Sequence, residues 1–148
     1  MTIRADANKL PFKNSIFDCI VSVETVDYLD AKKVFREYNR VLKKGGFLIF
    51  STGNNHGYKK YIHRVLSSHR TFYRYSFDEI KSYLEEESFE TTKCMGYNWI
   101  PVKRDSNSVL FGLFEFLENI SRLSHFPRIS PGVFFIAEKM EESNENSG

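Results

Sequence analysis

Two acidic residues, Glu24 and Asp27, and one histidine, His56, have side chains that could take part in chemistry. The two carboxylates are three positions apart, which places them on one face of a helical turn. Either could act as a general base for a hydroxyl or amine substrate, and either could equally be a solvated or helix-capping acid. His56 follows an apolar run, in a loop where a neutral imidazole could take a proton or simply face solvent. These three residues are the catalytic candidates, and none is decisive.

The segments around these residues read as strand, helix and strand. Residues 17–23 form a continuous apolar run, typical of a parallel strand that is buried on both faces. Cys19 lies in this run and is expected to be a small buried side chain. Asp30 is a plausible N-cap for a helix, and the apolar residues after it recur on one helical face: Val34, Phe35, Tyr38, Val41 and Leu42.

Lys43 and Lys44 favour the negative end of that helix, and Gly45 offers a left-handed stop. Residues 47–52 follow as a second apolar strand. A strand, a helix and a strand in about thirty residues form a βαβ crossover, which implies a parallel sheet.

Further elements are expected on both sides of this unit. Ser76 and Glu79 have the spacing of a capping box, which predicts a helix that buries Ile80, Tyr83 and Leu84. Strands are expected at residues 89–97 and 133–137, helices at 58–66 and 109–123, and the tail of a strand at 3–6. Residues 141–148 are polar, and we expect them to be disordered.

Composition limits the class of protein. The 148 residues are 41% hydrophobic and 27% charged, which is ordinary for one soluble domain, and the net charge of +2 gives no basis for nucleic-acid binding. Cys19 and Cys94 form no pairing motif, and the histidines have no metal-ligand spacing. No signal peptide or membrane-spanning stretch is visible, and two cysteines without a pairing pattern fit a reducing cytoplasm, where we expect the protein to be.

The order and spacing of three sequence blocks are informative. The blocks are Ala-Asp-Ala-Asn-Lys-Leu-Pro-Phe at 5–12, Ser-Ile-Phe-Asp-Cys-Ile-Val-Ser-Val-Glu at 15–24, and Arg-Val-Leu-Lys-Lys-Gly-Gly-Phe-Leu-Ile-Phe-Ser-Thr at 40–52. Together they resemble the class I, Rossmann-like methyltransferases that use S-adenosylmethionine (SAM) and act on small molecules. The resemblance implies an α/β fold with a mostly parallel sheet and an antiparallel last strand. It also implies SAM as the cofactor and a small-molecule acceptor.

The resemblance assigns part of a cofactor site. In the family, the acid of an Asp-Ala pair approaches the adenine amino group, and the next residue presents a backbone amide to the ring. Asp6 and Ala7 match that pair, although an Asp is also common in ordinary turns. The backbone near Ser22 and Val23 would face the methionine part of SAM, at the carboxyl edge where open α/β sheets bind ligands.

Residues 24–29 resemble a Glu-x-x-Glu-His block of a quinone-type O-methyltransferase branch, in which the acids and the histidine can hold a divalent metal. Here the second acid is Asp27, and Tyr28 replaces the histidine. Without the imidazole we expect no metal.

The family's first strands and glycine-rich cofactor loop have no counterpart in the sequence. We therefore expect residues 1–140 to be a partial, truncated domain, with residues 99–131 as an insertion or cap. The chain would be inactive alone and prone to self-association, and the strand at 17–23 would keep an unpaired edge. Two alternatives stay open, a non-catalytic interaction module that packs through residues 109–123 and one half of a split enzyme.

Overall fold

A mixed four-stranded sheet forms the centre of the fold. The computed structural model describes residues 2–57, 74–99 and 123–140. The strand order is β1-β2-β4-β3, with β1 parallel to β2 and β4 antiparallel to both of its neighbours. The strands are β1 Phe17–Val23, β2 Leu42–Gly53, β3 Phe89–Tyr97 and β4 Gly132–Lys139. Three strands thus run one way and the last one runs against them, which confirms the expected α/β sheet.

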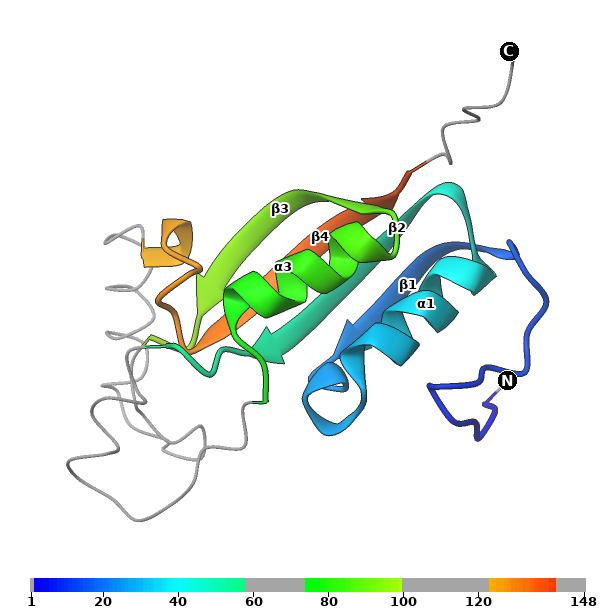
Figure 1. Ribbon diagram of the computed structural model, residues 1–148, viewed down its shortest axis with the longest axis horizontal. Helices are drawn as coiled ribbons and strands as arrows, with labels where there is room; N and C mark the ends of the chain where they lie inside the picture. Colours follow the sequence, from blue (N-terminus) through cyan, green and yellow to red (C-terminus); the bar gives the residue numbers. More distant parts are fainter. Residues whose placement is uncertain (1, 58–73, 100–122, 141–148) are drawn as a thin grey trace.

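Two helices cover one face of this sheet. α1 (Ala31–Val41) lies beside β1, and α3 (Phe77–Glu86) crosses in front of β2 and β4 (Figure 1). Asp30 caps α1 by accepting from the Lys33 N–H, and the capping box at the start of α3 is complete, as the sequence predicts. Two short 3₁₀ turns complete the described elements, η1 (Val26–Tyr28) and η2 (Leu123–His125).

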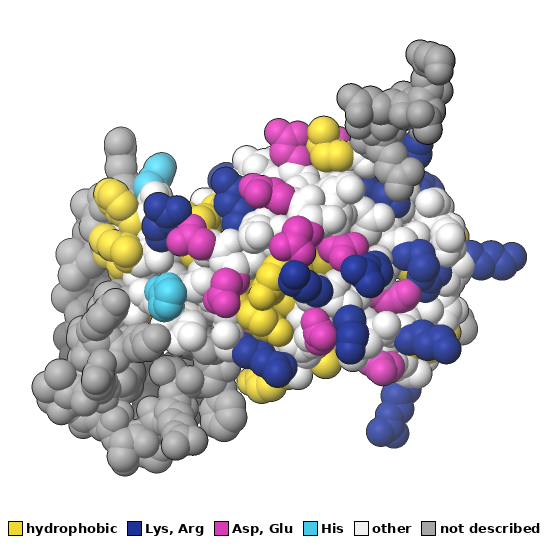
Figure 2. Space-filling view, viewed as in Figure 1, with side chains coloured by type: hydrophobic (Ala, Val, Ile, Leu, Met, Phe, Trp, Pro, Cys, Tyr) yellow, Lys and Arg dark blue, Asp and Glu magenta, His cyan; other side chains and the backbone are white. Residues whose placement is uncertain are grey.

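The core lies between the helices and the sheet. The Phe50 ring contacts Phe35 of α1 at 5.2 Å and stacks on Phe135 of β4 at 5.0 Å between centroids. These three side chains are fully or almost fully buried. One buried polar contact joins the layers, because the hydroxyl groups of Ser22 and Tyr38 lie 2.9 Å apart. Figure 2 shows that the outer surface of this helix-covered side mixes basic and acidic side chains.

The opposite side of the sheet, here called the open face, is largely apolar, and no described element covers it. Val21 is 66% exposed and Val23 63% exposed, although both lie in a parallel strand. The register places them on one surface with apolar neighbours from all four strands, namely Cys19, Phe47, Ile49, Met95, Phe134 and Ile136. The prediction that residues 17–23 are buried on both faces, with Cys19 inside, is therefore wrong. Among the described residues β1 ends the sheet, where the sequence predicts an unpaired edge.

The boundary between α1 and β2 also differs from its prediction. The helix ends at Val41, because Leu42 turns to an extended conformation that buries its side chain completely and pairs it with Phe17. Gly45 does have a positive φ of 68°, but it lies within β2, where the pairing of β1 and β2 shifts register. The basic residue in the last turn is Arg40, and Lys43 instead contacts Asp18 on β1.

The expected strand tail at residues 3–6 is not a strand, because its backbone finds no ladder partner among the described residues. Asp6 and Lys9 form an isolated bridge around a tight turn instead. The helices predicted at 58–66 and 109–123, most of the expected insertion at 99–131 and the expected tail at 141–148 lie outside the described residues.

Candidate functional site at the carboxyl edge of the sheet

Glu24 occupies the point where the chain leaves β1. Its backbone has a φ of 51°, in the left-handed region that non-glycine residues rarely adopt. The Glu24 N–H donates to both the backbone oxygen and Oγ of Ser51 on β2, each over 3.1 Å, which holds this conformation. The carboxylate is exposed, and the Tyr97 hydroxyl at the end of β3 donates to Oε1 over 3.5 Å. Strain of this kind is concentrated at functional sites, which makes Glu24 a residue of interest.

Asp27, the second acid, differs from Glu24 because both of its carboxylate oxygens accept hydrogen bonds within the fold. Its Oδ1 accepts from the Thr52 hydroxyl and its Oδ2 accepts from the Gly53 N–H, both over 2.9 Å. Burial raises the pKa of this carboxyl, while the two hydrogen bonds oppose the increase. Both carboxylate oxygens thus bind the end of β2, so Asp27 anchors η1 to that strand.

His56 lies in the loop after β2, where it is exposed and donates its backbone N–H to Oδ1 of Asn54. Asn54 itself is buried and joins three segments. Its Nδ2 donates to the backbone oxygens of Arg128 and Ser130, and its Oδ1 also accepts from the Phe77 N–H at the start of α3. Asn54 therefore shapes the loop that carries His56.

The two residues expected near the methionine part of the cofactor point to opposite sides. The Ser22 side chain is buried under α1 and bonded to Tyr38, so it is not available to a ligand, whereas the Val23 side chain lies on the open face. Both are paired with β2 along one side only, which leaves the other backbone edge of β1 free among the described residues. The free backbone edge of Ser22 and Val23 is where the prediction expects the cofactor to lie.

Asp6 and Ala7 lie in a four-residue turn. The Lys9 N–H donates to the Asp6 carbonyl oxygen over 3.0 Å, and Asp6 Oδ1 accepts from the backbone and side-chain N–H groups of Asn8. These bonds from Asn8 lower the pKa of Asp6, so the exposed carboxylate is charged at neutral pH. Asn8 Oδ1 is buried with no hydrogen-bond partner in the described part of the chain. The turn thus presents one exposed acceptor, the Asp6 carboxylate, which suits an amino group such as that of adenine.

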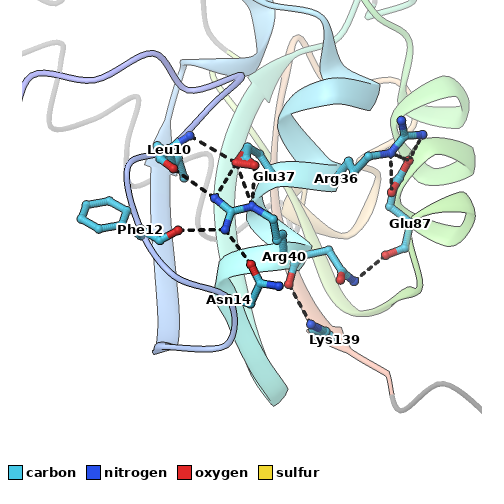
Figure 3. A network of polar contacts seen from close by, with 9 residues as sticks. Leu10, Phe12, Asn14, Arg36, Glu37, Arg40, Glu87 and Lys139 are labelled. Carbon is cyan, nitrogen blue, oxygen red and sulfur yellow. Dashed lines mark hydrogen bonds and ion pairs between the residues drawn. The ribbon is translucent and has the colours of Figure 1, made fainter.

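A network that sequence reasoning missed holds the segment after this turn (Figure 3). The Arg40 guanidinium donates to the backbone oxygens of Leu10 and Phe12 over 3.0 and 2.8 Å, and to Oδ1 of Asn14 over 2.8 Å. Its remaining donors bind the Glu37 carboxylate at distances from 2.6 to 3.2 Å. The matching block at 40–52 contained Arg40, but the sequence gives no sign of its partners.

Metal ligands are not grouped in the described residues: no three His, Cys, Asp or Glu side chains lie where they could hold an ion. The search for membrane-spanning segments, limited to the same residues, finds no helix that is long and apolar enough.

Comparison with known proteins supports the class that the blocks indicated. Residues 1–50 match the family described as a methyltransferase domain. An uncharacterized protein of Methanocaldococcus jannaschii is 32% identical over 100 residues, which are 67% of this chain and 37% of that protein. A malonyl-[acyl-carrier protein] O-methyltransferase of Herminiimonas arsenicoxydans is 27% identical over 71% of this chain and 42% of its own length. The chain thus spans less than half the length of these relatives.

Solved structures show the same fold at low identity. A SAM-dependent methyltransferase of Thermotoga maritima superposes with a TM-score of 0.65 at 20% identity, over 93% of this chain and 63% of its own. A geranyl diphosphate C-methyltransferase of Streptomyces coelicolor, solved with S-adenosyl-L-homocysteine, gives 0.57 at 17% identity, over 92% and 52%. Residues 1–50 thus match a methyltransferase-domain family, and the described chain has the fold of the class I, Rossmann-like methyltransferases. The cofactor of that class is SAM.

Proposed function

We propose that this chain is the carboxyl-terminal part of a SAM-dependent methyltransferase that acts on a small molecule. It would work only with an amino-terminal layer of strands and helices, on the same or a separate polypeptide. The observation that carries this proposal is the open face. Val21 and Val23 belong to a parallel strand at the edge of the sheet and are 66% and 63% exposed, whereas parallel strands are ordinarily covered on both faces.

The physical cost of this exposure supports a missing layer. Burying a valine side chain contributes roughly 1.5–3 kcal/mol, and the open face gathers such side chains from all four strands. The free edge of β1 would accept another parallel strand, and helices would cover the face beside it. A second copy of the chain is the competing occupant of this face.

The residues present suit one end of the cofactor. The turn at Asp6 offers an exposed, charged carboxylate to an amino group, and Ala7 packs against the core behind it. When bound, SAM supplies an electrophilic methyl group. The Asp6 turn would hold the adenine end, and the backbone of Ser22 and Val23, at the edge of the sheet, would face the methionine part.

Among the catalytic candidates, the geometry favours Glu24 as the group that takes a proton from the acceptor. Both oxygens of Asp27 are occupied by Thr52 and Gly53. Glu24 is exposed at the carboxyl edge with Tyr97 beside it. An acceptor that is already nucleophilic needs no base, so positioning would then be the main contribution.

Calorimetric titration with SAM tests the proposal on two proteins, this chain and the same chain joined to the sequence encoded upstream of it. We expect saturable binding only by the longer protein. Within it, Asp6→Asn should weaken SAM binding roughly tenfold, since a charged hydrogen bond contributes about 1.5–3 kcal/mol. Asp18→Asn is the matched control: it is another exposed acid, bonded to Lys43, and should leave the affinity unchanged. Equal binding by both lengths would refute the proposal.

A further inference from the structure

The segment between the turn at Asp6 and β1 has little regular structure, yet it is held firmly against α1. It runs beside that helix before entering the sheet (Figure 1). Leu10 is fixed at both of its backbone groups, because its N–H donates to Oε2 of Glu37 and its oxygen accepts from Arg40. Phe12 is fixed by its oxygen and by an edge-to-face contact with Phe17 at 5.0 Å.

We propose that Glu37 and Arg40 are positioning residues for the cofactor, forming a clamp that sets the place of the Asp6 turn. The inference rests on the proposed role of Asp6 at the adenine end. Lys9 closes that turn through its N–H, and Leu10, the next residue, is the first one clamped. A shift at Leu10 therefore moves the turn as a unit.

The chemistry of the clamp requires an arginine. A guanidinium has five N–H donors in a planar fork, and Arg40 uses all five. Three of them donate to Leu10, Phe12 and Asn14, and the other two donate to Glu37. A lysine has its donors on one atom and cannot reach carbonyl oxygens two residues apart and a carboxylate at once. Pro11 between the two clamped carbonyls restricts the backbone further.

Glu37 completes the arrangement. It lies three positions before Arg40 on the same helical face, and its carboxylate both orients the guanidinium and accepts from Leu10. The Arg40 hydrogen bond lowers the pKa of Glu37, so the pair stays charged at neutral pH. Both side chains are mostly shielded from solvent, at 13% and 31% exposure, where such a contact is worth more than on an open surface.

α1 provides a matched control for this clamp. Arg36 lies one turn earlier and also forms a short ion pair, to Glu87 at 2.9 Å, but that pair ties the helix to the turn after α3. It touches no residue of the clamped segment (Figure 3). Arg36→Lys therefore disturbs an arginine–carboxylate contact of the same helix, although a more exposed one, and leaves the turn intact.

Two measurements test the inference. The first is amide hydrogen exchange of this chain without any ligand, where Arg40→Lys should speed exchange at Leu10 about tenfold and Arg36→Lys should not. The second is SAM titration of the longer, SAM-binding protein. There Arg40→Lys and Glu37→Gln should raise the Kd for SAM about tenfold while the KM of the acceptor stays constant, and Arg36→Lys should do neither.

Several outcomes would overturn the proposal. If the parent protein binds SAM and Arg40→Lys binds it equally well, the clamp is only structural. If Arg36→Lys weakens SAM binding as much, the effect is one of general stability. If the parent protein binds no SAM, the proposed function fails together with this inference, and the exchange measurement still reports the clamp itself. Should Arg40→Lys not fold, Glu37→Gln carries both measurements.

Discussion

Asp27 Oδ1 and the Thr52 hydroxyl lie 2.9 Å apart, and this contact ties the first turn after β1 to the end of β2. The Gly53 N–H binds the other oxygen of the same carboxylate. Asp27, a candidate base in the sequence, thus connects η1 to β2 at the carboxyl edge of the sheet.

Asp27→Asn should destabilise the chain by about 1–3 kcal/mol, because the amide has one neutral acceptor oxygen where the carboxylate uses two charged ones, so either the Thr52 hydroxyl or the Gly53 N–H loses its acceptor. Thr52→Val, which keeps the side-chain shape, should cost about 1 kcal/mol. Urea unfolding followed by circular dichroism measures both. A neutral result for Asp27→Asn would show that the carboxylate does not anchor η1.

The stabilising effect of Asp27 should depend on pH. Burial raises its pKa above the ordinary value of 3.8, so the folded chain holds this proton more tightly than the unfolded chain does. The contribution of Asp27 is therefore largest below that value and declines as pH rises through the raised pKa. The advantage of the parent chain over Asp27→Asn should thus be greater at pH 3.5 than at pH 7, in the same urea experiment. The opposite slope would contradict the assigned burial.

Glu24 gives a prediction about strain. Its φ of 51° suits glycine, so Glu24→Gly should raise the free energy of unfolding by about 1 kcal/mol. Glu24→Ala keeps the strained backbone and serves as the control, with no comparable gain expected. Chemical denaturation of the two variants side by side distinguishes relief of strain from loss of the carboxylate. Equal stability of the two would remove strain from the description of this site.

Substitution of Asn54 should lower the free energy of unfolding substantially. Asn54→Ala removes its contacts to three segments and leaves buried N–H and carbonyl groups unpaired, at about 3 kcal/mol in total. The neighbouring Asn55→Ala should change stability by less than about 0.5 kcal/mol. Thermal unfolding of both variants measures this difference. Similar melting temperatures would show that the hydrogen bonds of Asn54 do not stabilise the chain.

The open face should drive self-association of the chain. Replacing Val21 and Val23 together by Asp should lower association in sedimentation velocity, at a cost of only about 1 kcal/mol per site, since both side chains are exposed. Val133→Asp, on the buried face of β4, should instead unfold the chain. Unchanged association of the double variant would mean that copies of the chain do not meet through this face.

Local signals account for what the sequence could predict. The strands β1 and β3, the Asp30 cap and the capping box of α3 depend on neighbouring residues, and each was found where its pattern lies. The end of α1 was not, since the full burial of Leu42 against the rest of the fold decides it.

The site was less predictable, for a reason of distance along the chain. The Arg40 clamp joins residues 26 to 30 positions apart, and Asn54 reaches residues more than 70 positions away. Neither leaves a periodic pattern. The exposure of Cys19 and Val21 depends on whether a second layer is present, which no property of β1 itself encodes.

The central claim is that this chain holds one end of a SAM site and needs an amino-terminal layer to bind the cofactor. Thermal unfolding of the 148-residue chain, with and without millimolar SAM, tests it most directly. We predict the same melting temperature in both conditions, because ligand that binds only weakly adds little to stability. A clear, saturable rise in melting temperature with SAM would show that the chain binds the cofactor alone and would contradict the account.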